Sequence, residues 1–304
     1  MYTFSFYPYQ YPFKTPLQTH HGTWEQREGI IVNLTDTTGN TGKGEIAPLP
    51  WFGSESFSTA LGFCQQLDNK ITPETIYNLP DSLPACQFAL ESALADLTAT
   101  SSPSPTPSQL SHLLPTGETC LHHWQTPYQQ GIRTFKVKIA VSPLRQELSI
   151  IQQLLNLLPP DCKLRLDANG GLTLDTAQQW LQRLDHYSKL EFLEQPLPPQ
   201  DWTTLCQLSQ TYQTPLALDE SVATLSQLQA CYHGGWTGIF VIKAAIAGSP
   251  QKLKQFCQTH SLDLVFSSVF ETPIGMQAAF RLAQDLASPH RALGYGISHW
   301  FNSL

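Results

Sequence analysis

Short aliphatic segments alternate with longer amphipathic ones through the last two thirds of the chain. Eight short segments rich in branched and aromatic residues predict strands, at 112–115, 134–139, 163–169, 190–196, 215–220, 238–243, 262–268 and 292–296. Amphipathic stretches such as 142–158 and 173–187 separate them and are long enough for parallel crossovers. Eight repeats of strand and helix predict an α/β protein with a (β/α)8-type barrel.

An open, doubly wound sheet would show the same alternation of strands and helices. Such sheets usually bind nucleotides at a glycine-rich loop after a strand, and no GxGxxG or GKS/GKT loop follows any of the predicted strands. We therefore expect a closed barrel.

The first hundred residues have a different pattern, which predicts an N-terminal α+β capping domain over 1–100. A strand at 29–34, a turn rich in Gly, Asn and Thr, and a short strand ending at 45–46 predict a hairpin. Helical periodicity follows at 56–71 and 84–97.

A run of Ser, Thr and Pro at 98–109 then interrupts all periodicity and indicates a linker. We place the barrel domain at 101–296. The last residues, 297–304, are expected to pack back on the capping domain.

The composition is that of a folded globular protein. Hydrophobic residues make up 41% of the 304 residues, and the 17 basic residues form no cluster, so we expect no nucleic-acid partner. The seven cysteines form no CxxC pair, and no signal peptide or window of 18 apolar residues is present. These features predict a cytoplasmic protein with reduced thiols and no membrane contact; a monomer is compatible with the sequence, which does not decide the oligomeric state.

Ionisable residues fall near the C-terminal ends of five successive predicted strands. They are Lys138, Asp167, Glu194, Asp219 and Lys243, separated by 24 to 29 residues, about one strand–helix unit each. Equivalent positions on successive strands converge on one rim of a barrel, and barrel active sites lie at that rim. The five side chains are therefore expected to share one pocket.

Three of these five residues are carboxylates. Oxygen ligands from separate rigid strands suit Mg²⁺, whereas three carboxylates without a cation would repel one another and raise their pKa values. The sequence therefore predicts a site for Mg²⁺, with Mn²⁺ as a substitute, formed by Asp167, Glu194 and Asp219.

Two lysines stand two residues apart in the segment FKVKIA and so point to the same side of their strand. A neighbouring ammonium group and a metal ion lower the pKa of a lysine toward a value suited to general-base catalysis. Lys138 is the candidate base, Lys136 its electrostatic neighbour, and Lys243 approaches from the far side of the carboxylates. Each residue alone could equally form a structural salt bridge or strand cap; the joint pattern favours a catalytic site.

The motifs KVK, DANGG, EQP, DES, VIK and SSVFET occur in this order over residues 110–296 and resemble the enolase superfamily. The match is to the muconate-lactonizing-like subgroup, with lysines on the second and sixth strands, and GKGEIAPLPWFGSES resembles its capping domain. The resemblance implies that Asp167, Glu194 and Asp219 bind Mg²⁺. It also implies that Lys138 removes a proton α to a carboxylate and that the metal stabilises the enediolate.

Three activities of that subgroup compete: o-succinylbenzoate synthase, N-acylamino acid racemase or dipeptide epimerase, and muconate-type cycloisomerase. Dipeptide epimerases usually have an acidic DxD near the eighth strand, where this chain has ALGYGIS. The segments LLPTG and SSVFETPIG resemble the o-succinylbenzoate synthase group most. That resemblance implies a carbon–oxygen lyase, a hydro-lyase that dehydrates a succinyl-bearing hydroxycyclohexadiene carboxylate in menaquinone or phylloquinone biosynthesis.

The same resemblance suggests roles for the remaining residues of the site. Lys138 would remove the α-proton and then assist the departure of hydroxide, while Lys243 would face the other side of the ring as a cation–π partner. Asn169 would hold a ligand or a water. Ser267 and Ser268 would donate to the succinyl carboxylate, although serines at strand ends are also simple caps.

The capping domain is expected to supply a lid from two segments, "PLPWFGSES" and "KTPLQTHHGTW". Trp51, Phe52, His20 and His21 belong to them, and we expect the two histidines to be exposed and not catalytic.

Two other interpretations remain open at this level. A Schiff-base aldolase would also place a lone lysine such as Lys243 at a barrel strand end, but three carboxylates at unit spacing favour a metal. A barrel that only binds ligands would normally have lost the base or a metal ligand, and this sequence has lost neither.

Overall fold

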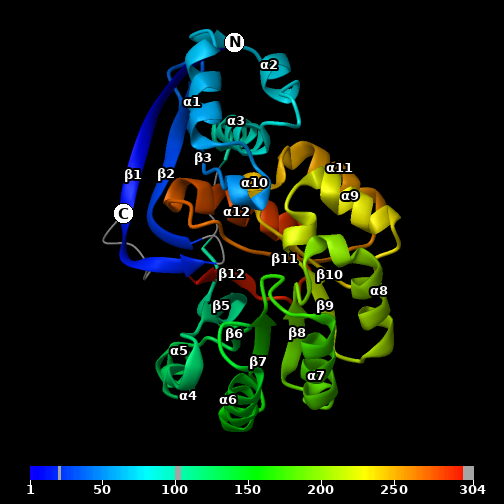
Figure 1. Ribbon diagram of the computed structural model, residues 1–304. Coiled ribbons are helices and arrows are strands. Elements are labelled where there is room, and N and C mark those ends of the chain that lie inside the picture. The colour runs from blue at the N-terminus through cyan, green and yellow to red at the C-terminus, as the bar shows by residue number, and fades with distance from the viewer. Residues whose placement is uncertain (20–21, 100–103, 297–304) are drawn as a thin grey trace.

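The computed structural model describes residues 1–19, 22–99 and 104–296. A cap built from the N-terminal region sits on one end of a barrel of parallel strands (Figure 1). This architecture confirms the predicted fold class. The predicted positions of His20 and His21, and the predicted packing of residues 297–304, lie outside the described residues.

The barrel has eight parallel strands in the order β11-β10-β9-β8-β7-β6-β5-β12. An isolated parallel bridge between Ser267 and Gly294 joins the two ends of this order and closes the ring. Each strand lies within two residues of its predicted bounds. The strands are β5 (Leu110–Leu113), β6 (Thr134–Lys138), β7 (Lys163–Asp167), β8 (Leu190–Glu194), β9 (Leu216–Leu218), β10 (Ile239–Ile242), β11 (Asp263–Phe266) and β12 (Leu293–Gly296).

Amphipathic helices surround the strands, as the periodicity predicts. In α6, for example, Leu148, Ile151 and Leu155 recur at steps of three and four residues and are buried. The larger helices are α6 (Leu144–Leu157), α7 (Leu174–Leu184), α8 (Trp202–Thr211), α9 (Leu225–His233), α11 (Pro250–Thr259) and α12 (Pro273–Leu286); α4 (Cys120–His123), α5 (Gln125–Gln129) and α10 (Ala244–Ala247) are short.

The cap contains an antiparallel sheet in the order β3-β2-β1-β4 and three helices. Its elements are β1 (Tyr2–Thr19), β2 (Gly22–Thr35), β3 (Thr41–Ile46), α1 (Phe57–Gln66), β4 (Lys70–Ile71), α2 (Pro73–Tyr77) and α3 (Pro84–Asp96). Helix α3 packs so closely on β3 that a Cβ atom at Gly44 would lie 2.0 Å from the carbonyl oxygen of Ala89. Gly44 therefore has no room for a side chain.

Two features of the cap differ from the prediction. The helix expected at 56–71 ends at Gln66, and Lys70–Ile71 form a strand that pairs with Tyr2 and Thr3. Strand β1 was not predicted at all, although it pairs with β2 over most of its length. Lys70–Ile71 were missed because their pairing partner lies far away in the sequence, where local periodicity carries no information about it. Strand β1 forms a hairpin with β2, the next strand along the chain, but Pro8, Pro12 and Pro16 interrupt its strand pattern.

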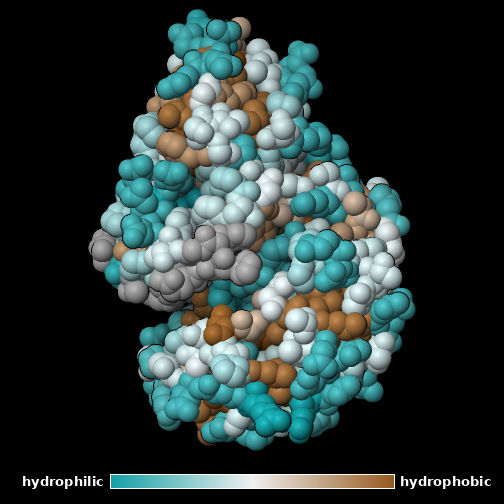
Figure 2. All heavy atoms as spheres, in the orientation of Figure 1, coloured by the Kyte–Doolittle hydropathy of each residue, from teal (hydrophilic) through white to brown (hydrophobic). Residues whose placement is uncertain are grey.

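The helices, the exposed apolar residues and the thiols of the described residues bear on the sequence-based expectations. None of the helices there is long and apolar enough to cross a membrane. Figure 2 shows the apolar residues of the visible face in separate patches among hydrophilic ones. All seven cysteines are free.

A buried ionic network fills the end of the barrel where the strands begin. Arg165 is 1% exposed; its Nε lies 2.6 Å from Glu191 Oε2, and its Nη1 donates to the carbonyl of Ala292 (2.8 Å). Glu191 also pairs with Arg291 (3.0 Å), which in turn pairs with Asp263 (2.6 Å). Burial disfavours the charge on Glu191, but the two guanidinium groups outweigh it and lower its pKa.

Glu45, at the end of β3, joins the cap to the barrel. Its carboxylate accepts hydrogen bonds from the backbone N–H groups of Thr272 (2.9 Å) and Gly275 (2.9 Å) at the start of α12, and from the hydroxyl of Tyr9 (2.5 Å). A carboxylate at a helix N-terminus meets unpaired N–H groups and the positive end of the helix dipole. Glu91 of α3 repeats this arrangement at α11, where it accepts from Gln251 N–H (2.9 Å).

A second acid, Glu271, is buried beside this joint. Its Oε2 accepts from Ser268 Oγ (2.8 Å) and from Val269 N–H (2.7 Å), while its Oε1 is buried without a partner. Burial raises the pKa of Glu271 to about 7, because these hydrogen bonds compensate only part of the lost hydration.

Replacing Arg165 should destabilise the protein strongly. We expect Arg165→Met to lower the free energy of unfolding by about 3–5 kcal/mol, because Glu191 would keep a buried charge with one partner fewer. Lys254→Met breaks an exposed pair with Asp285 and should cost no more than about 1 kcal/mol. Urea unfolding of both variants tests this; equal midpoints would contradict the structural role of the network.

The raised pKa of Glu271 predicts a pH-dependent stability. The folded state holds this proton more tightly than the unfolded state, so the contribution is fully present below the unfolded pKa and is lost as pH rises through about 7. Glu271→Gln copies the neutral acid. The free energy of unfolding of this variant, relative to that of wild type, should therefore be higher at pH 8 than at pH 5, by on the order of 1 kcal/mol. Thermal unfolding of wild type and variant at both pH values measures this difference. A difference independent of pH would show that Glu271 does not titrate in this range.

Candidate functional site

The rim of the barrel brings together the five ionisable residues found by strand spacing. Lys138, Asp167 and Glu194 are the last residues of β6, β7 and β8 and are paired in register across the three strands. Asp219 and Lys243 directly follow β9 and β10. Lys138 and Lys243 stand four strands apart in the ring of eight, so they approach the carboxylates from opposite sides of the barrel mouth.

Each lysine is bound to a polar group of this rim. Lys136 Nζ lies 2.9 Å from Asp167 Oδ2 and 2.6 Å from Glu194 Oε1. Lys243 donates to Asp219 Oδ1. Lys138 donates to Asn169 Oδ1 at 3.0 Å. The pleat thus places Lys136 and Lys138 on the inner side of β6, where the period of two predicts them.

The carboxylates of the rim are buried and unequally neutralised. Burial disfavours the charge on Asp167, but the neighbouring charges of Lys136 and Lys138 outweigh it and lower its pKa. The pKa of Glu194 is raised by burial and by the charge of Asp167. The pKa of Asp219 is also raised by burial, which its ion pair with Lys243 offsets only in part. At Glu194 and Asp219, burial and the neighbouring carboxylates therefore outweigh the charges of the lysines.

This donor set has the chemistry of a site for a divalent cation. The side chains of Asp167, Glu194 and Asp219 are each 2% exposed or less and offer hard oxygen atoms from three consecutive strands. Within the described ranges, no three His, Cys, Asp or Glu side chains are already grouped around one metal position. Instead, Lys136 and Lys243 engage the carboxylate oxygens. Bound Mg²⁺ would compete with these ammonium groups and relieve the repulsion that raises the pKa of Glu194.

Asn169 lies in the turn after β7 and has a left-handed backbone (φ 46°). It is therefore not part of the strand, which was predicted to extend over 163–169. Its Nδ2 donates to Glu220 Oε1 (3.0 Å), so its amide connects the ammonium of Lys138 to Glu220. Burial and the charge of Asp167 raise the pKa of Glu220. Glu220 stands beside Asp219 in the motif DES, but strand spacing did not identify it.

The two serines lie at the end of β11, but the hydroxyl of one is already engaged. Ser268 Oγ donates to Glu271 Oε2 and accepts from Phe270 N–H (2.8 Å), and the residue is buried. Ser267 lies against Gly294 at the bridge that closes the barrel. Because the hydroxyl of Ser268 already donates its proton to the buried Glu271, Ser268 is a poor hydrogen-bond donor for an anionic group.

Aromatic residues of the cap lie over the rim. The ring centroid of Phe52, in the 3-10 turn η1 (Pro50–Phe52), is 3.8 Å from Lys243 Nζ, a cation–π contact that the sequence analysis did not predict. Trp24 of the cap packs against Trp51 (5.2 Å between ring centroids) and against Phe270 of the barrel (5.5 Å). These contacts place part of the predicted lid at the barrel mouth.

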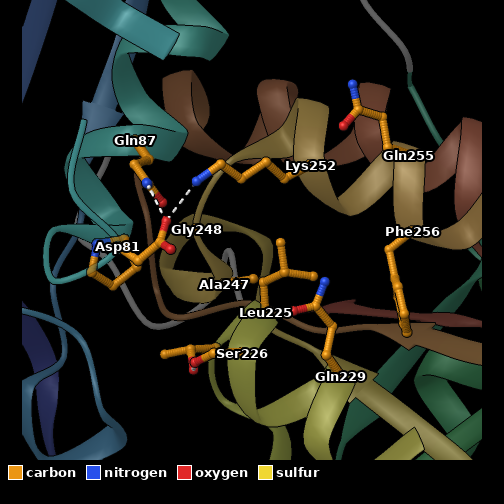
Figure 3. Close-up of a pocket in the computed structure, with 12 residues that line it drawn as sticks. Asp81, Gln87, Leu225, Ser226, Gln229, Ala247, Gly248, Lys252, Gln255 and Phe256 are labelled. Atoms are coloured by element: carbon orange, nitrogen blue, oxygen red, sulfur yellow. Dashed lines mark hydrogen bonds and ion pairs between the residues drawn. The ribbon is translucent and has the colours of Figure 1, made fainter. Parts of the chain in front are cut away.

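A separate cavity of about 350 Å³ lies between the cap and α9, α10 and α11 (Figure 3). Asp81 on its wall accepts from Gln87 Nε2 (2.9 Å) and pairs with Lys252 (2.7 Å). None of the lysines or carboxylates of the rim lines this cavity. It belongs to the seam between cap and barrel and not to the candidate site.

Comparisons with known proteins cover nearly the whole chain. Residues 1–97 match the family model described as MenC, N-terminal domain, and residues 121–300 match the model described as Enolase C-terminal domain-like. The chain is 41% identical to an o-succinylbenzoate synthase of Thermosynechococcus vestitus over 96% of this chain and 91% of the relative. It is 28% identical to one of Enterococcus faecalis, over 88% and 79%.

Solved structures agree with these matches. The crystal structure of o-succinylbenzoate synthase from Thermosynechococcus elongatus, complexed with Mg in the active site, has a TM-score of 0.93 and 39% identity, covering 99% of this chain and 95% of that chain. The L-Ala-D/L-Glu epimerase from Bacillus subtilis has a TM-score of 0.81 at 20% identity, covering 99% and 90%, which shows the shared fold alone. This chain therefore belongs to the o-succinylbenzoate synthase family, an enzyme family of the enolase superfamily.

Proposed function

We propose that this protein is a Mg²⁺-dependent hydro-lyase that converts 2-succinyl-6-hydroxy-2,4-cyclohexadiene-1-carboxylate to o-succinylbenzoate, in menaquinone or phylloquinone biosynthesis. The observation that carries the proposal is the arrangement of three buried carboxylates between lysines on opposite sides of the barrel mouth, in a chain of this family. Asp167, Glu194 and Asp219 would hold the ion, and the Mg named for the Thermosynechococcus elongatus structure supports this assignment. When bound, Mg²⁺ supplies Lewis-acid stabilisation of negative charge on the substrate carboxylate.

Lys138 acts as the base and then as the acid. Its Nζ is held by Asn169 Oδ1 at 3.0 Å, which fixes the direction from which it approaches the substrate. It removes the proton α to the ring carboxylate, and the ammonium that forms returns this proton to the departing hydroxyl. One C–H bond and one C–O bond break, a ring double bond forms, and water leaves, so the ring becomes aromatic.

The other two lysines provide fixed positive charge. Burial disfavours the charge on Lys136, but Asp167 and Glu194 outweigh it and raise its pKa, so Lys136 stays protonated beside Lys138. Lys243 is positioned by Asp219 and by the ring of Phe52, and it faces the substrate ring from the opposite side. Positive charge on both sides stabilises the electron-rich ring that follows proton removal.

The thiols support a proposal for the compartment. Seven free cysteines fit a reducing compartment, and we place the protein in the cytoplasm.

Removing either lysine of the opposed pair should abolish the reaction. We expect Lys138→Ala and Lys243→Ala each to lower kcat by about 10²–10⁴-fold. This is the usual contribution of a positioned acid–base or charge-stabilising group. Formation of the aromatic product can be followed by ultraviolet absorbance. Lys163→Ala, at an exposed residue of β7 away from the rim, serves as a matched control and should keep wild-type turnover.

Cation removal provides the second arm of this test. EDTA should stop the reaction and added Mg²⁺ should restore it. Wild-type protein that forms no aromatic product with Mg²⁺ present would refute the proposed activity, and racemisation of an N-acylamino acid would then be the activity to measure. Near-normal turnover by Lys138→Ala would refute the mechanism while leaving the activity in place.

A further inference from the structure

Gln195 directly follows Glu194 and has no exposed surface. Its backbone is left-handed (φ 34°), a conformation that is unfavourable for a residue other than glycine, so the surrounding structure must maintain it. Its side chain is hydrogen-bonded to the segment after β9.

All four hydrogen-bonding positions of the Gln195 amide are used. Its Oε1 accepts from the backbone N–H of Asp219 (3.0 Å) and of Ser221 (3.1 Å). Its Nε2 donates to Ser221 Oγ (2.8 Å) and to the carbonyl of Leu197 (2.9 Å). A fully satisfied buried amide of this kind fixes the segments it joins.

These bonds begin where the strand pairing stops. The ladder between β8 and β9 ends at Glu194 and Ala217, where Gln195 N–H donates to the carbonyl of Ala217 (2.8 Å). Two residues later, the Asp219 N–H is bound by the Gln195 side chain instead of a neighbouring strand. The Gln195 amide therefore continues the connection between β8 and β9 as far as Asp219.

Asn169 anchors the same segment from the other side through Glu220. The stretch that carries Asp219 is thus held between two amides, each in the left-handed turn that follows a rim carboxylate. Removing a group that positions the ligands of a cation in this way typically weakens binding of the cation by about 10–100-fold.

We propose that Gln195 is a positioning residue that sets the place of Asp219 relative to Glu194, and so determines how tightly the rim binds a divalent cation. The inference deepens the proposed function and rests on it, because it assumes that these carboxylates hold the ion. Gln195 itself contacts neither ion nor substrate. Ser221, which accepts and donates within the same group of bonds, is its partner in this role.

The test measures Mn²⁺ binding to the cation-free protein by electron paramagnetic resonance, together with the thermal midpoint. Gln195→Met keeps the length of the side chain and removes its hydrogen bonds, and we expect Mn²⁺ to bind about 10–100-fold more weakly. Gln87→Met is the matched control. Gln87 is also buried and bonded through Nε2, to Leu79 O (2.9 Å) and Asp81 (2.9 Å), but it lies in the cap. The Gln87→Met variant should have a lower thermal midpoint and the same affinity for Mn²⁺ as wild type.

The outcomes separate this inference from the proposed function. If wild type binds Mn²⁺ and Gln195→Met binds it within twofold of wild type, the positioning role is wrong and the proposed function stands. Equal weakening in Gln87→Met would also overturn the inference, because loss of stability would then explain the effect. If Gln195→Met does not fold, Ser221→Ala decides: weaker binding supports the role and unchanged binding refutes it. Wild type that binds no Mn²⁺ refutes both proposals.

Discussion

The charge balance at the barrel mouth is the constraint on which the rest of this structure depends. Asp167, Glu194 and Asp219 are almost completely buried, and moving an ionised carboxylate out of water costs several kcal/mol unless cations compensate. Lys136 and Lys243 supply part of that compensation by direct ion pairs. The raised pKa of Glu194 shows that they do not supply all of it. Strands, turns and cap all serve to keep these groups close together and away from bulk water.

Buried polar groups help to define how the cap meets this mouth, in addition to a hydrophobic core that continues from the cap into the barrel. Glu45 caps the first turn of α12 from the end of β3, and Glu91 does the same for α11. Because both contacts are directional and involve charged groups, they restrict the orientation of the cap. That orientation brings Phe52 onto Lys243, so the geometry of the site depends on contacts made well outside it.

Sequence pattern alone predicted the eight barrel strands and the five residues at their ends, because period-two alternation and unit spacing are local properties. It did not predict β1, in which prolines interrupt the strand pattern, and it extended a helix over Lys70–Ile71, which pair with the distant first residues of the chain. Among site residues, Gln195 and Glu220 were missed, although each directly follows a predicted ligand. Their hydrogen bonds depend on which segment they touch, and sequence spacing does not contain that information.

The sequence by itself determined the class of fold, the rim on which the ionisable residues meet and the type of chemistry that such residues support, since each follows from residue type and period. Tertiary structure decided the rest. It turned Ser268 toward Glu271, set Asn169 between Lys138 and Glu220, and tied Asp219 to the amide of Gln195. These contacts join residues from different strands and loops. Their geometry arises only when the barrel closes and its buried polar groups must all find partners.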